Sequence, residues 1–64
     1  MNIDSLVSRI RAEFIEMPGL RLTMAQAARL WNLEVTVCER AVDELVRASF
    51  LRRDQAGFLL RALG

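Results

Sequence analysis

The stretch Thr23–Phe50, TMAQAARLWNLEVTVCERAVDELVRASF, contains two short helical patterns separated by a few turn residues. Each pattern opens on a threonine with a Gln or Glu three residues later, Thr23 with Gln26 and Thr36 with Glu39. This spacing is typical of a capping box. The threonine oxygen accepts from an N–H of the first helical turn, and the longer side chain reaches back to the N–H of the cap residue.

Two capped helices joined by a tight turn are the outline of a helix-turn-helix. The helix after Thr23 is expected to turn four apolar side chains inward, which are Met24, Ala27, Ala28 and Trp31. The helix over residues 37–48 is expected to bury Cys38, Ala41, Val42 and Leu45. Between them, Asn32 stands where a helix often ends in the left-handed conformation, which asparagine tolerates.

The segment before this unit also has helical periodicity. Its apolar side chains recur at helical spacing and predict a helix over residues 3–17, with Ile3, Leu6, Val7, Ile10, Phe14 and Met17 on one face. Asn2 or Asp4 is expected to cap its start, and Pro18 with Gly19 to end it. The alternation of Leu20, Arg21 and Leu22 is consistent with a short edge strand before Thr23.

The segment after the unit has a different pattern. Apolar and basic residues at 50–53 and 58–61 flank the polar loop Asp54–Gly57, which predicts a β-hairpin over residues 50–61. Side chains from three helices and from the start of the hairpin are expected to meet in the core, namely Phe14, Trp31, Leu45 and Phe50. The sequence therefore predicts an α+β fold with three helices and a small antiparallel hairpin.

Length and composition set the class of protein. The chain has 64 residues and 53% apolar residues, so we expect a single globular domain over residues 1–64 with one small core. No run approaches the ~20 apolar residues of a membrane span. The start Met1-Asn2-Ile3-Asp4 lacks the basic and apolar blocks of a signal peptide. We therefore expect a cytoplasmic protein with no membrane partner.

The residue types argue against several kinds of chemistry. With one cysteine and no histidine, the chain has neither an internal disulfide nor a standard zinc site. It also lacks tyrosine and a glycine-rich phosphate loop, so the usual acid–base and nucleophile sets are missing. Cys38 is expected to be a small buried hydrophobe. We expect no enzyme, no cofactor, no metal and no small-molecule ligand.

The order of the predicted elements resembles that of the winged helix-turn-helix family. The residues that carry the resemblance are LTMAQAARLWNLEVTVCERAVDELVRASFLRR. Small stand-alone bacterial members with an EMPGL-like turn, here Glu16–Leu20, look similar. Most such domains have glycine where this chain has Asn32 and Ser49. The resemblance covers nearly the whole chain and implies a hairpin that acts as the wing.

The resemblance also implies a function, that of a small bacterial DNA-binding protein and transcriptional regulator. The helix over residues 36–48 would enter the major groove, with the hairpin 50–61 as the wing beside it. The candidate groove residues are Thr36, Val37, Arg40, Asp43 and Arg47. The candidate phosphate contacts are Thr23, Gln26 and Arg29 before the turn, and Arg52, Arg53 and Arg61 on the wing. Double-stranded DNA is thus the first expected partner.

Charge leaves a second function open. The net charge is only +1, and residues 36–47 hold three acids against two arginines, a balance that phosphates repel. Asp43 and Arg47 have the i,i+4 spacing of an intrahelical ion pair. The alternative is a winged-helix module for protein–protein interaction or dimerisation that does not bind DNA. A homodimer would use Ala12, Ile15 and Leu63 near its contact.

Overall fold

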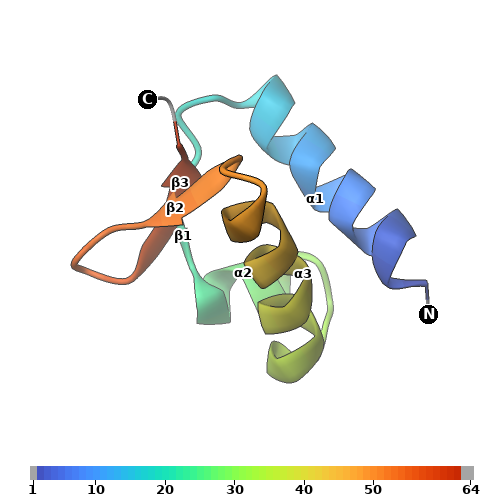
Figure 1. Ribbon diagram of the computed structural model, residues 1–64. Coiled ribbons are helices and arrows are strands. Elements are labelled where there is room, and N and C mark those ends of the chain that lie inside the picture. The colour runs from blue at the N-terminus through green and yellow to red at the C-terminus, as the bar shows by residue number, and fades with distance from the viewer. Residues whose placement is uncertain (1, 63–64) are drawn as a thin grey trace.

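The computed structural model describes residues 2–62, which form three helices and a three-stranded antiparallel sheet (Figure 1). In chain order the elements are α1 (Ile3–Glu16), β1 (Leu22–Thr23), α2 (Met24–Leu30), α3 (Val35–Arg47), β2 (Leu51–Arg53) and β3 (Phe58–Arg61). The strands lie in the order β1-β3-β2. The predicted α+β class is confirmed, and β1 adds a third strand to the hairpin.

Both ends of α1 follow from local sequence. The side-chain oxygen of Asn2 accepts from the N–H of Asp4 at 2.9 Å and caps the start. The helix ends at Glu16, one residue before the predicted end, because a residue before proline is disfavoured in the helical conformation. A turn follows in which the Met17 carbonyl accepts from the N–H of Leu20 at 2.9 Å.

The first predicted capping box is confirmed at the start of α2. The N–H of Gln26 donates to the Thr23 hydroxyl at 3.1 Å, and the Thr23 N–H donates to the Gln26 side chain at 2.9 Å. At the other end, Asn32 has a φ of 54°. The N–H of Leu33 reaches back to the Ala28 carbonyl at 2.8 Å. This is a Schellman motif with asparagine at its left-handed position.

The second predicted capping box, Thr36 with Glu39, is wrong. The cap residue of α3 is Glu34, whose side chain makes no capping hydrogen bond, and Thr36 lies inside the first turn. The Schellman motif that ends α2 explains the shift, because it leaves Glu34 in an extended conformation directly after Leu33. The Glu34 carbonyl then accepts the first helical bond of α3, from the Cys38 N–H at 3.0 Å.

A second Schellman motif ends α3. The N–H of Ser49 donates to the Val46 carbonyl at 3.0 Å, and the N–H of Phe50 donates to the Leu45 carbonyl at 2.9 Å. Ser49 has a φ of 60°, a conformation that glycine adopts more readily than serine. The motif turns the chain directly into the hairpin.

The predicted hairpin is confirmed, with β2 beginning at Leu51 rather than at residue 50. Leu51 pairs with Arg61, and Arg53 with Leu59. On its other edge, β3 pairs with β1, where Leu22 faces Leu59. The loop between β2 and β3 contains Gly57 with a φ of 88°.

One hydrophobic core joins the helices to the sheet. Its buried members are Leu6, Ile10, Phe14, Ala27, Ala28, Trp31, Cys38, Ala41, Val42, Leu45, Leu51 and Leu59. The Phe14 and Trp31 rings pack with their centroids 6.3 Å apart. Of the four side chains predicted to meet in the core, three are buried, and Phe50 is half-buried against it. Because Trp31 is only 4% exposed, its predicted place in the core is confirmed.

Candidate functional site

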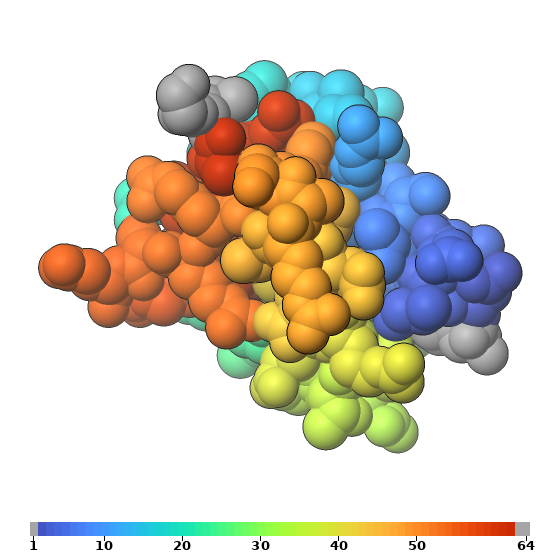
Figure 2. All heavy atoms as spheres, viewed as in Figure 1, coloured from blue at the N-terminus to red at the C-terminus, as the bar shows by residue number. Residues whose placement is uncertain are grey.

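The outer face of α3 carries a row of polar side chains. Thr36, Arg40, Asp43 and Arg47 are separated by four, three and four residues, which places them on one side of the helix. All four are exposed, and we call them the outer row. Val37, also a groove candidate, is half-buried and packs against the core. Figure 2 shows α3 on the near face of the molecule, with the hairpin beside it and projecting past it.

An ion pair links the outer row to the hairpin. The Arg53 guanidinium lies 2.7 Å from the Asp43 carboxylate, with both side chains about half exposed. The predicted pair of Asp43 with Arg47 is therefore wrong, because the fold brings β2 close to the side chain of Asp43. A pair this exposed to solvent stabilises by only about 0–1 kcal/mol, so it contributes little to the stability of the fold.

Arg52 and Arg53 lie on opposite faces of the sheet, as the alternation of a strand requires. Arg53 faces α3 and lines a hollow with Met24, Glu39, Gly57 and Leu59. Arg52 lines a different hollow, with Pro18, Gly19, Leu20, Arg21, Leu60 and Arg61. Of these two candidate wing arginines, only Arg53 is on the same side as the outer row.

The Arg61 side chain lies against the Phe50 ring rather than extending from the wing into solvent. Its guanidinium carbon lies 4.0 Å from the centroid of the Phe50 ring, and that of Arg11 lies 5.3 Å from the same centroid. Arg61 is half-buried, and its Nε is buried without a hydrogen-bond partner. The expected role of Arg61 as a phosphate contact on the wing is not supported by this position.

The three candidates around α2 differ in whether their side chains already make hydrogen bonds. The side chains of Thr23 and Gln26 bond each other's backbone in the capping box. Arg29 is exposed in the last turn of α2. Because the side chains of Thr23 and Gln26 are already bonded in the capping box, Arg29 is the side chain of this group best placed to bind an anion.

One arginine that the sequence reasoning left unassigned holds the hairpin loop. Arg21 donates to the Asp54 carboxylate at 3.0 Å, and its guanidinium carbon lies 4.6 Å from the centroid of the Phe58 ring. The same carboxylate accepts from the N–H groups of Phe58 and Ala56, each at 2.9 Å. The bond from Phe58, then those from Arg21 and Ala56, outweigh desolvation and lower the pKa of Asp54. The edge strand expected over residues 20–22 overlaps β1 only at Leu22, and no local pattern indicates a partner of Arg21 that is 33 residues away.

Cys38 has the buried position that the sequence predicted, on the inner face of α3. Its side chain is fully buried. Burial, with a smaller contribution from the charge of Glu39, raises the pKa of the thiol. The thiol is therefore protonated at neutral pH and packs as a small apolar group.

Comparisons with family models, with curated proteins and with solved structures find no match for this chain. Within residues 2–62, no helix is both long enough and apolar enough to cross a membrane. In the same part of the chain, no three His, Cys, Asp or Glu side chains are grouped so that they could hold a metal ion.

Proposed function

We propose that this chain is a winged helix-turn-helix protein that binds double-stranded DNA and regulates transcription. In this proposal α3 enters the major groove, and the β2–β3 hairpin is the wing beside it. The order of helix, strand, helix, helix and hairpin supports the class, as does the tight turn at Asn32 between α2 and α3.

The observation that carries the proposal is the outer row on α3. A helix that reads base edges needs polar side chains along one exposed side while its other side stays anchored. The outer row meets the first condition, and the buried Cys38, Ala41, Val42 and Leu45 meet the second. Arg40, at the centre of the helix, has the donor geometry for a guanine edge.

The attraction of the arginines to DNA phosphates has to overcome the repulsion between those phosphates and the acidic side chains of α3. Glu39, Asp43 and Glu44 outnumber Arg40 and Arg47 on this helix. Asp43, however, is already paired with Arg53. When the hairpin meets the DNA backbone, we expect the half-exposed Arg53 guanidinium to donate to a phosphate through its other N–H groups while it keeps its bond to Asp43. Arg29 would add a second phosphate contact from α2.

Two neighbouring arginines test this arrangement. Replacing Arg53 with alanine should weaken binding to all DNA sequences alike and reduce the salt slope by about one unit. Arg52→Ala is the matched control, because Arg52 lies on the opposite face of the same strand. Anisotropy titrations at several salt concentrations would measure both. If Arg52→Ala lowers the slope and Arg53→Ala does not, the proposed orientation is wrong.

A separate variant tests the reading of bases. Arg40→Ala should weaken preferred sites by about 1–3 kcal/mol and mixed duplex much less, because its proposed role is base recognition. The preferred sites would come from selection on a random duplex pool. Equal losses on selected and mixed DNA would make Arg40 a phosphate contact instead.

The second candidate function is a module for protein–protein interaction or dimerisation that does not bind DNA. The alternating charge of α3 favours it, since three acids and two arginines suit a protein surface as well as a groove. Within residues 2–62, four large apolar side chains are also exposed, Ile15, Met17, Leu30 and Val35. A protein that fails to bind DNA but self-associates through one of these side chains would support this alternative.

A further inference from the structure

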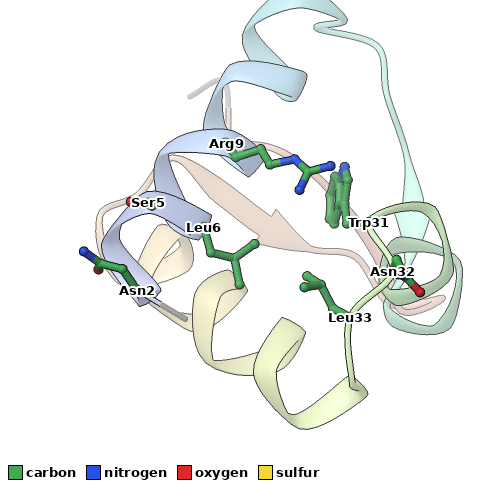
Figure 3. Close-up of a pocket in the computed structure, with 7 residues that line it drawn as sticks. All are labelled: Asn2, Ser5, Leu6, Arg9, Trp31, Asn32 and Leu33. Carbon is green, nitrogen blue, oxygen red and sulfur yellow. The ribbon is translucent and has the colours of Figure 1, made fainter.

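We propose that a hollow between α1 and the α2–α3 turn binds a small carboxylic acid with an apolar body. The hollow has a volume of about 530 Å³, within the range of about 300–1,000 Å³ that is usual for small-molecule sites. Seven residues line it (Figure 3): Asn2, Ser5, Leu6, Arg9, Trp31, Asn32 and Leu33.

The middle of the hollow is apolar. Leu6 of α1 and Leu33 of the turn point toward one another across it, with the Trp31 ring on one side (Figure 3). Leu6 and Trp31 are almost fully buried, and Leu33 is half-buried. An apolar ligand body placed here would cover mainly Leu33, the most exposed of the three, and displace water from it.

A buried donor without an acceptor lies at one end. Trp31 is only 4% exposed, and its indole Nε1 is buried with no hydrogen-bond partner. Leaving such an N–H unpaired is unfavourable, and nearly all buried polar groups avoid it. Trp31 Nε1 therefore points to a ligand that supplies an acceptor atom.

Arg9 supplies a positive charge at the same end. Figure 3 shows its guanidinium next to the indole of Trp31, and both residues line the hollow. None of the seven lining residues is acidic, and none of the ion pairs found within residues 2–62 involves Arg9. Because its side chain is long and exposed, Arg9 can turn to admit a ligand to Nε1.

These features together select a carboxylate. One oxygen would accept from the Arg9 guanidinium, which binds carboxylates well, and the other would accept from the indole N–H. A neutral ligand would leave the arginine unpaired. The hollow shares no residue with the outer row of α3, so the inference does not depend on DNA binding.

The test uses the single tryptophan of the chain. In a ¹⁵N-labelled sample it gives one indole N–H signal, which reports directly on the proposed hydrogen bond. Phenylacetate is the probe, and the neutral phenylacetamide is its matched control. We expect phenylacetate to shift the indole signal saturably and phenylacetamide to bind about tenfold more weakly or worse, a difference set by the charge.

Two variants complete the test. Arg9→Gln should weaken phenylacetate binding by about tenfold while the melting temperature stays unchanged, because Arg9 is exposed. Arg11→Gln, on the same helix but outside the hollow, should leave the affinity unchanged. The proposal is overturned by an indole signal that does not move up to ~10 mM phenylacetate. Equal affinity for the acid and the amide, or an Arg9→Gln variant that binds normally, would overturn it as well.

Discussion

At the residue scale, Asn32 and Ser49 occupy equivalent positions in two helix-ending turns. Both hold the left-handed position of a Schellman motif, with φ of 54° and 60°. Glycine is the usual residue there because a Cβ atom is strained in this conformation. Asparagine bears that strain better than serine does. Each motif directs the next apolar residue, Leu33 or Phe50, onto the core.

Replacing Ser49 with glycine should stabilise the protein. Relief of the left-handed strain outweighs the extra entropy of an unfolded glycine, for a net gain of about 0.5–1 kcal/mol. In a domain of this size that corresponds to a rise of about 2–8 °C in melting temperature. Thermal unfolding followed by circular dichroism measures it.

Asn32→Gly is the control for this prediction. We expect a smaller gain than for Ser49→Gly, because asparagine already tolerates the conformation. A lower melting temperature for Ser49→Gly would show that the serine makes a stabilising contact that outweighs its backbone strain.

At the scale of the element, the two threonine patterns of the sequence have different outcomes. Thr23 caps α2 through both bonds of a capping box. Thr36 has the same spacing to an acid but lies within α3, which begins two residues after Leu33. Both threonines are followed three residues later by a Gln or Glu, so the local pattern is the same. What separates the two is the Schellman motif before α3, which fixes the point where that helix restarts.

This difference predicts unequal costs for two matched substitutions. Thr23→Ala should lower the free energy of unfolding by about 0.5–2 kcal/mol, because the first-turn N–H of Gln26 loses its acceptor. Thr36→Ala should change it by no more than about 0.5 kcal/mol, since Thr36 is an exposed helical residue and alanine favours helices. Urea unfolding of both variants measures the difference. Similar costs for the two would mean that Thr36 also acts as a cap.

At the scale of the whole molecule, periodicity and caps carried most of the fold prediction. The apolar stripe of residues 3–17, the Thr23 cap and the loop Asp54–Gly57 each correspond to an observed element. Met17 is the exception within the stripe, because it follows the end of α1 and is exposed. The candidate site was less predictable. Arg53 meets Asp43, and Arg61 meets Phe50, across ten and eleven residues. Such partners depend on how the sheet packs on the helices, which local patterns do not encode.

Self-association is the first prediction at this scale. Along its longest axis the backbone of residues 2–62 extends 31 Å, so in the proposed DNA complex one copy would cover a single half-site, since half-sites lie ~34–36 Å apart. Ile15 is 52% exposed, and Ala12 beside it on α1 is exposed too. Leu63, the third expected contact residue, lies outside the described residues. We expect a dimer in sedimentation experiments at micromolar concentration.

A substitution at the expected contact tests the dimer directly. Ile15→Glu should shift the protein to the monomer without loss of fold, because a charged side chain at an exposed position disturbs an apolar contact and leaves the core intact. Gln55→Glu, in the exposed loop of the hairpin and away from α1, is the control. A parent protein that stays monomeric would favour a heteromeric partner instead.

The central claim is that α3 and the hairpin form a DNA-binding face. A fluorescence anisotropy titration of the full chain against mixed-sequence duplex at low salt tests it most directly. We predict saturable binding with a dissociation constant of ~10⁻⁴ M or tighter, since non-specific DNA binders usually reach ~10⁻⁴–10⁻⁶ M even near physiological salt. Binding should weaken steeply as salt is added. No anisotropy change up to about 100 µM protein at low salt would contradict the claim.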